Sequence, residues 1–212
     1  MTTHQVTATP RRPVRSARSW PVPAALVALS AIPLAAGTLR LVQLAGGPPL
    51  MPADARFGTF PLALVLHIVG AATYALVGAF QFVPRFRRRH RTWHRRAGRV
   101  LTGAGLLVAG SALWMTLAYP PQPGTGDLLY LLRLTFGSAM AACLILGLTA
   151  VRRRDIPAHR AWMIRAYAIA LAAGTQVFTE GLDAVVGGDL AKGAGWLINL
   201  AVAEWTIRRT RS

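Results

Sequence analysis

The stretch Pro84–Arg99 reads PRFRRRHRTWHRRAGR and carries eight arginines and two histidines between two long apolar runs. Part of its pattern returns 65 residues further along the chain. The first copy is Arg87-Arg88-Arg89, four residues and His94-Arg95, and the second is Arg152-Arg153-Arg154, four residues and His159-Arg160. Each copy follows one apolar run and opens the next. We therefore interpret them as two positively charged turns, each presenting a histidine where a helix re-enters a membrane.

The composition is typical of a membrane protein. The chain has 212 residues, of which 53% are hydrophobic, and a net charge of +17 from 24 basic and 7 acidic side chains. Nucleic-acid-binding domains of such charge interleave basic and polar residues on one face. Here the charges form short blocks between apolar runs of roughly 20 residues, the length that crosses a bilayer. We therefore exclude a nucleic-acid partner and expect a lipid bilayer. The single cysteine, Cys143, lies in an apolar run and is expected to be a packing residue.

The apolar runs predict an all-α, polytopic integral membrane bundle with six transmembrane helices. The expected spans are residues 21–44, 60–83, 97–119, 128–151, 162–179 and 193–207, of which the last is the weakest. Residues 1–20 are polar and basic, so a disordered arm is expected there, and residues 208–212 form a basic tail. Cleavage of the first span as a secretory signal is an alternative that leaves the other spans unchanged.

The distribution of basic residues predicts how the spans are oriented. Six spans place the arm, both basic turns and the tail on one side, and these segments hold 20 of the 24 basic residues. Basic residues are retained on the cytoplasmic side during insertion, so both termini should be cytoplasmic. The expected location is the inner (cytoplasmic) membrane of a bacterial-type cell, with several passes.

The repeat predicts two related hairpins, formed by the second and third spans and by the fourth and fifth. If the hairpins pack side by side, His94 and His159 lie at equivalent depths. Two imidazoles at one depth match the axial ligands of a six-coordinate haem iron. Arg95 and Arg160 are candidate partners for the haem propionates, because guanidinium groups match carboxylates. The pattern thus allows a haem b or redox site and indicates no other metal.

The same basic turns also fit a simpler role. Clusters of basic residues beside a membrane bind anionic lipid headgroups, at about 1 kcal/mol per residue. His94 and His159 fall at the ends of spans rather than a turn or two inside them. This position favours headgroup binding over haem ligation.

A second polar layer is expected near the outer surface. It contains Arg40, His67, Arg133, Gln176 and Glu180. Ionisable groups inside a span are costly and normally face the bundle interior, and pairing of Glu180 with Arg133 or Arg40 would offset part of that cost. The layer is a candidate site for a transported substrate or for a lipid or quinone headgroup. The alternative is a neutral His67 and an arginine that extends to the outer headgroups.

Three segments carry a family resemblance: LHIVGAATYALVGAFQFVPRFR (Leu66–Arg87), HRRAGRV (His94–Val100) and HRAWMIRAYAIA (His159–Ala170). Over residues 60–173 the chain resembles the bacterial predicted membrane proteins called domain of unknown function 2306. The resemblance implies a multi-span bundle with a signature of His67, Gln81, Arg85, His94, Gly98, His159, Trp162, Met163 and Arg165. Where such proteins commonly read HRWLGR, this chain reads HRRAGR, which keeps His94, Gly98 and Arg99. The resemblance implies no activity.

The sequence therefore predicts a multi-pass membrane protein of undetermined activity. Two hypotheses are left open: a haem b or redox protein, and a transporter-like or headgroup-binding protein. Whether the chain is an enzyme is also open. The sequence has no serine–histidine–acid arrangement, no carboxylate-rich metal set and no phosphate-binding glycine loop. A homodimer is compatible with such a bundle.

Overall fold

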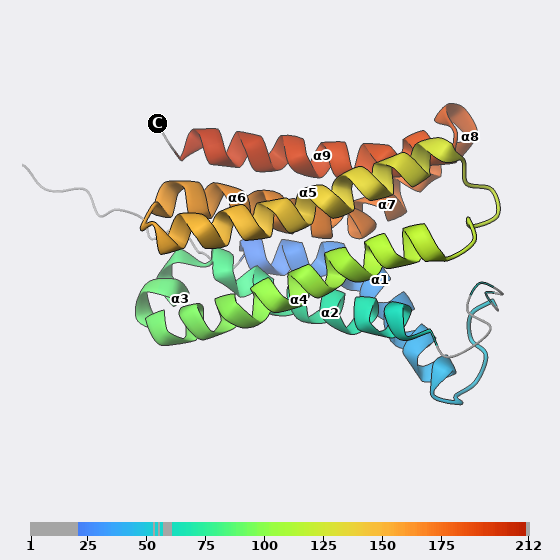
Figure 1. The fold of residues 1–212 in the computed structure, drawn as a ribbon, viewed down its shortest axis with the longest axis horizontal. Helices are drawn as coiled ribbons and strands as arrows, with labels where there is room; N and C mark the ends of the chain where they lie inside the picture. Colours follow the sequence, from blue (N-terminus) through green and yellow to red (C-terminus); the bar gives the residue numbers. More distant parts are fainter. Residues whose placement is uncertain (1–20, 53, 55, 57–60, 211–212) are drawn as a thin grey trace, which may run out of the picture.

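The computed structural model describes residues 21–52, 54, 56 and 61–210, and these residues contain helices and no strands. The long helices run nearly side by side along one axis (Figure 1). This arrangement confirms the predicted all-α bundle. The expected disordered arm and residues 211–212 of the basic tail lie outside the described residues.

Long helices alternate with short connecting ones. The long elements are α1 (Pro21–Leu44), α2 (Leu62–Ala79), α4 (Arg91–Ala118), α5 (Asp127–Arg152), α6 (Ile156–Ala170) with α7 (Ala172–Thr179), and α9 (Gly188–Arg209). The short ones are η2 (Phe80–Phe82), α3 (Pro84–Arg89), η3 (Glu180–Leu182) and α8 (Asp183–Val186). One end of the bundle holds α3, the α5–α6 turn and the end of α9, and the other end holds α8 and the α4–α5 loop (Figure 1).

Most of the long helices meet the requirements for crossing a membrane. Among the described residues, α1, α2 with η2, α4 and α5 are long and apolar enough, and α6 with the helices that follow it adds a fifth span if this pair, bent by 44°, is counted as one. Helix α9 is not in this group, and it carries Asp189, Lys192 and Glu204 within its length. By length and composition, the described residues therefore contain four helices, or up to five, that could cross a membrane, and the predicted count of six is not confirmed.

Two helices begin earlier than the apolar runs that predicted them. Helix α4 begins at Arg91 rather than at residue 97, and α6 begins at Ile156 rather than at residue 162. Arginine is a good helix former, so the helix continues beyond the apolar segment. Helix α6 also has a start signal, because the Asp155 carboxylate accepts a hydrogen bond from the Ala158 amide at 3.0 Å. Hydropathy locates the apolar segment, whereas capping decides where the helix begins.

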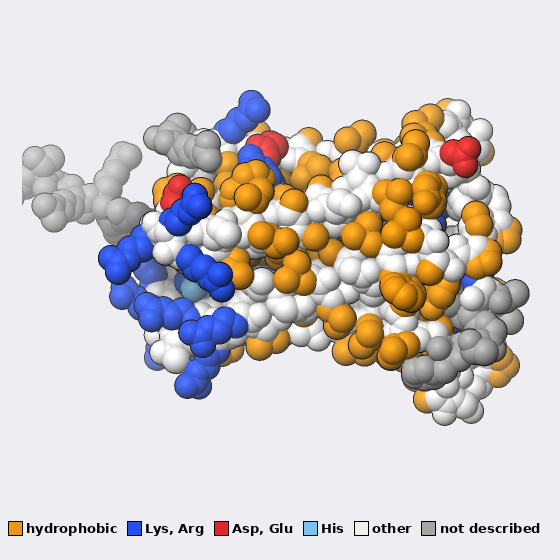
Figure 2. Space-filling view, in the orientation of Figure 1, with side chains coloured by type: hydrophobic (Ala, Val, Ile, Leu, Met, Phe, Trp, Pro, Cys, Tyr) orange, Lys and Arg blue, Asp and Glu red, His pale blue; other side chains and the backbone are white. Residues whose placement is uncertain are grey.

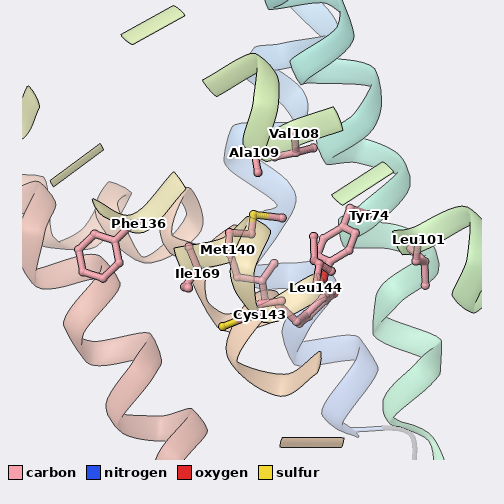
Figure 3. Close-up of a cluster of buried hydrophobic side chains, with 12 residues drawn as sticks. Tyr74, Leu101, Val108, Ala109, Phe136, Met140, Cys143, Leu144 and Ile169 are labelled. Carbon is pink, nitrogen blue, oxygen red and sulfur yellow. The ribbon is translucent and has the colours of Figure 1, made fainter. Parts of the chain in front are cut away.

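The main core lies where α2, α4, α5 and α6 meet (Figure 3). The Tyr167 hydroxyl of α6 donates a hydrogen bond to the Ala75 carbonyl of α2 at 2.7 Å. The Tyr167 ring lies against Gly78, where an added Cβ would overlap it. Small residues on α2 thus let α6 approach closely, and this contact joins the helices of the two predicted hairpins.

The sides of the bundle are apolar and one end is basic. Large exposed apolar side chains occur on each long element, among them Ile32, Leu76, Trp114, Ile145, Phe178 and Leu197. Figure 2 shows apolar side chains along the sides, while lysine and arginine gather at the end that holds α3. An apolar surface of this extent is suited to lipid contact.

Candidate functional site

The first basic turn is built from two helical segments with a break between them. Pro84 occupies the first turn of α3, where its missing N–H costs nothing. Helix α3 ends at His90, whose backbone angles (φ −122°, ψ 61°) are not helical, and α4 begins at the next residue. The eight arginines of the stretch Pro84–Arg99 are therefore spread over two helices of different direction at one end of the bundle (Figure 2).

The second basic turn is tighter, although its sequence repeats the first. Arg154 adopts a left-handed backbone conformation with φ of 62°. Asp155 follows and caps α6. The two copies of the repeat thus have different local structures, because only the first contains a proline that starts a separate short helix.

An open pocket of about 500 Å³ lies between the two basic turns. It is lined by Arg87, Arg88, Arg91, His94, Arg95 and Ile156. Four arginines and one histidine contribute to this lining, which includes no acidic residue. The acidic residue that precedes Ile156 in the chain, Asp155, is engaged in capping α6. We call this space the arginine pocket.

His94 and Arg95, which the sequence had singled out, both line the arginine pocket. The Nδ1 atom of His94 is buried and has no hydrogen-bond partner among the described residues. Buried polar atoms normally have a partner, so this nitrogen is an exception among the described residues. The arginine pocket is therefore lined by basic residues, and one of them holds an unpartnered nitrogen that is not accessible from the surface.

His159 lies near the pocket but is not part of its lining. Its Nδ1 atom is 2.8 Å from the Gly147 carbonyl oxygen of α5. A carbonyl only accepts hydrogen bonds, so Nδ1 carries the proton and Nε2 keeps its lone pair. His159 is close enough to act electrostatically on His94. The use of the two histidines of the repeat as joint ligands stays a prediction of the hairpin arrangement.

Arg160 is engaged elsewhere. Its guanidinium group donates a hydrogen bond to the Thr210 hydroxyl, just after the end of α9. Arg160 therefore connects α6 to the end of α9. This contact does not bring it to the arginine pocket beside Arg95.

The residues of the expected outer layer take part in separate contacts. Arg40 donates to the Gln43 side-chain oxygen at 3.1 Å and to the Pro52 carbonyl at 3.0 Å. His67 places Nδ1 at 3.2 Å from the Val108 carbonyl and at 3.1 Å from the Ser111 hydroxyl, which joins α2 to α4. These contacts satisfy the polar groups locally and do not bring Arg40 and His67 together.

The expected pairing of Glu180 with Arg133 or Arg40 is wrong. Glu180 pairs with Lys192 of α9 at 3.8 Å. Gln176 also contacts α9, because its side-chain amide donates to the Lys192 carbonyl at 2.9 Å. The segment between α7 and α9 brings these residues together, and no local sequence pattern indicates that contact. Arg133 is half-buried and has no hydrogen bond or ion pair among the described residues.

The loop after α1 contains one more ion pair at this end. Arg56 lies 2.5 Å from Asp54, and its guanidinium group holds the pKa of that carboxyl below its ordinary value. Both residues lie between α1 and α2. Arg40 of the expected outer layer is close enough for its charge to act on Asp54.

Two polar contacts inside the bundle were not anticipated. Arg165 of α6 binds Glu204 of α9 through two hydrogen bonds, of 2.5 and 3.0 Å. Asn199 of α9 donates to the Ala168 carbonyl at 3.0 Å and accepts from the Thr175 hydroxyl at 2.7 Å, on the two sides of the α6–α7 bend. A glutamate and an asparagine within an apolar run were the available signal, because polar groups in a span need partners.

The comparisons with known proteins give a family and no activity. Comparison of the chain with curated proteins and with solved structures finds no match in either set. One family model, described as "Predicted membrane protein (DUF2306)", matches residues 64–207. The match begins in α2, ends in α9 and includes the arginine pocket and both histidines of the repeat. Because it covers well over half of the chain, this protein belongs to the DUF2306 family of predicted membrane proteins.

Proposed function

We propose that this chain is a six-span protein of the inner membrane whose basic end lies in the cytoplasm and binds anionic lipid headgroups. The observation that carries the proposal is the absence of acidic partners for the basic stretch Pro84–Arg99. All seven acidic side chains belong to the described residues. Within that part of the chain, the ion pairs join Arg56 to Asp54, Arg165 to Glu204 and Lys192 to Glu180. The counter-charge for the eight arginines must therefore come from outside the chain.

The orientation rests on the same charges. The basic turns lie at the end of the bundle where α9 also ends with Arg208 and Arg209 (Figure 1). Arginine-rich segments are retained in the cytoplasm, where the anionic leaflet attracts them. This end of the bundle is accordingly assigned to the cytoplasmic side.

Helix α9 is the sixth span of this proposal. Its 22 residues extend about 33 Å, enough to cross the hydrocarbon core. Its low apolarity comes from residues that have partners in neighbouring helical segments, namely Lys192, Asn199 and Glu204. It also carries exposed Leu190, Leu197, Ile198, Val202 and Trp205. A helix whose polar groups are satisfied and which exposes apolar groups is compatible with lipid.

Headgroup binding is tested with fluorescent phosphatidylglycerol and the purified chain in detergent micelles. The affinity should fall stepwise as Arg85, Arg89, Arg96 and Arg99 are changed to glutamine. It should also fall as salt rises from about 50 to about 500 mM, because exposed charges are screened. An affinity independent of both changes would contradict the proposal.

A second candidate is a haem b site with His159 and His94 as ligands. The favouring observation is the hydrogen bond from His159 Nδ1 to Gly147, which holds the ring in the manner common for metal-binding histidines and leaves Nε2 available. A bound haem would supply one-electron transfer, and Arg95 lies beside His94 in the pocket lining as a partner for a propionate. An outer-layer substrate site is the weaker alternative, because four of its five residues are engaged in other contacts.

The absorption spectrum of the purified protein tests the haem candidate. The expected result is a reversible change in the visible bands on reduction with dithionite, lost in both His94→Ala and His159→Ala. A colourless preparation from haem-replete cells would remove this candidate, as would undiminished haem in either variant.

A further inference from the structure

The arginine pocket differs from the rest of the basic end in three ways. It is concave, it is lined by four of the eight arginines of Pro84–Arg99, and one of its lining residues, His94, has a buried imidazole nitrogen without a partner among the described residues. The other four arginines, Arg85, Arg89, Arg96 and Arg99, do not line it. A diffuse headgroup layer needs only exposed charge. A concave site lined by arginines from two helices suits one ligand of defined shape.

The chemistry of the lining selects a phosphate group. Guanidinium groups bind phosphate oxygens through paired, charge-assisted hydrogen bonds. The donors come from two helices, since Arg87 and Arg88 belong to α3 and Arg91 to α4. Donors from two directions suit the tetrahedral oxygens of a phosphate better than the two oxygens of a planar carboxylate.

The charge of the lining selects a phosphomonoester over a diester. Four arginines face the pocket and no carboxylate belongs to its lining. A phosphomonoester carries a charge of about −1.5 to −2 at pH 7 and offers three terminal oxygens. A diester headgroup carries about half that charge and has two such oxygens.

We propose that the arginine pocket is a discrete binding site for one phosphomonoester group, carried by a lipid headgroup such as phosphatidate or by a soluble phosphate ester. The site rests on the proposed function, because it lies within the basic end assigned to the cytoplasmic headgroup layer. It goes further in naming one stoichiometric ligand and the residues that hold it. The phosphate oxygens are bound by Arg87, Arg88, Arg91 and Arg95, and His94 forms part of the pocket lining.

The experiment uses the full chain in nanodiscs of neutral lipid with fluorescent phosphatidate or with phosphatidylglycerol. Because phosphatidylglycerol carries about half the charge of phosphatidate, its mole fraction is doubled, so that the two kinds of nanodisc carry the same surface charge. The expected result is at least about tenfold tighter binding of phosphatidate, with saturation at one molecule per chain. Glycerol 3-phosphate is then added as a soluble competitor. Displacement at low concentration assigns the site to soluble esters, and its failure assigns it to the lipid.

Matched variants separate the pocket from the rest of the basic end. Arg87→Gln with Arg91→Gln removes two charges from the lining, whereas Arg85→Gln with Arg99→Gln removes two exposed charges outside it. The first pair should abolish the preference for phosphatidate, and the second should preserve it. Arg87→Lys with Arg91→Lys keeps the charge but loses the paired donors, and it should also lose most of the preference. A thermal unfolding curve for each variant shows that it is folded.

Equal binding of the two lipids, or equal loss of preference in both glutamine pairs, would overturn the discrete site. Salt-sensitive binding of anionic lipid would then persist, and the proposed function would stand. If the unmodified chain instead fails to bind any anionic lipid, the proposed function is overturned. The two failures are therefore distinguishable.

Discussion

Arg165 of α6 and Glu204 of α9 form a two-point ion pair, with Nε 2.5 Å from Oε1 and Nη2 3.0 Å from Oε2. Arg165 lies about 14 Å along α6 from the start of that helix at Ile156, at 1.5 Å per residue. The guanidinium group also lies 4.7 Å from the centre of the Trp162 ring. On the proposal that α9 crosses the membrane, this pair is what makes a glutamate in that span tolerable.

Removing one partner of the Arg165–Glu204 pair should destabilise the protein more than removing both partners. Arg165→Met removes the guanidinium partner of Glu204, and Glu204→Gln removes the carboxylate partner of Arg165. Each should lower the free energy of unfolding by about 2 kcal/mol, since both side chains are only partly buried. The double variant should lose less than the sum of the two. The measurement is thermal unfolding in detergent as a double-mutant cycle, and additive losses would contradict a direct interaction.

Gly78 should be intolerant of even one methyl group. An alanine Cβ there would overlap the ring of Tyr167, which is buried and hydrogen-bonded to Ala75. Gly78→Ala should therefore destabilise the bundle by about 1–3 kcal/mol through overpacking. Gly110→Ala in α4 is the control, because nothing lies within 4 Å of its Cβ position, and it should be neutral or slightly stabilising. Similar unfolding temperatures for the two variants would contradict the α2–α6 contact.

Replacing Arg154 with glycine should stabilise the folded protein. Its φ of 62° is costly for a side chain with a Cβ, at about 1–2 kcal/mol. Arg154→Gly should raise the free energy of unfolding by up to about 1 kcal/mol. Its neighbour Arg153 has φ of −81°, so Arg153→Gly removes the same charge without relieving any strain and should be neutral or destabilising. Equal effects in chemical unfolding would show that charge, and not backbone conformation, determines the outcome.

Apolar runs predicted some helices closely and others poorly, for an identifiable reason. The predicted bounds of α1 agree with the structure, and those of α5 differ by one residue at each end, because their apolar runs and their helices coincide. The starts of α4 and α6 were missed because arginine and histidine extend a helix beyond its apolar part. The bend after Ala170 was also missed, since no proline marks it.

The candidate site was predicted in its residues but not in its geometry. The repeat predicted that His94 and His159 lie at one end of the bundle, because two hairpins with matching turns place them there, and their role as joint ligands stays a prediction. It did not predict that His94 faces a pocket while His159 binds Gly147. That difference depends on the break at His90, which gives the first turn a separate short helix. Pairings across loops, such as Glu180 with Lys192, depend on the loop path and leave no trace in local sequence.

The most direct test of the six-span arrangement is to determine on which side of the membrane each loop lies. Cys143 is the only cysteine, so Cys143→Ala gives a background for single cysteines at Arg88, Gln122, Arg153, Asp183 and Thr210. A membrane-impermeant thiol reagent is applied to intact and then to permeabilised cells. Positions 122 and 183 should react in intact cells, and positions 88, 153 and 210 only after permeabilisation. Reaction of positions 88 and 153 on different faces, or of 183 and 210 on the same face, would contradict the six-span arrangement with one basic side.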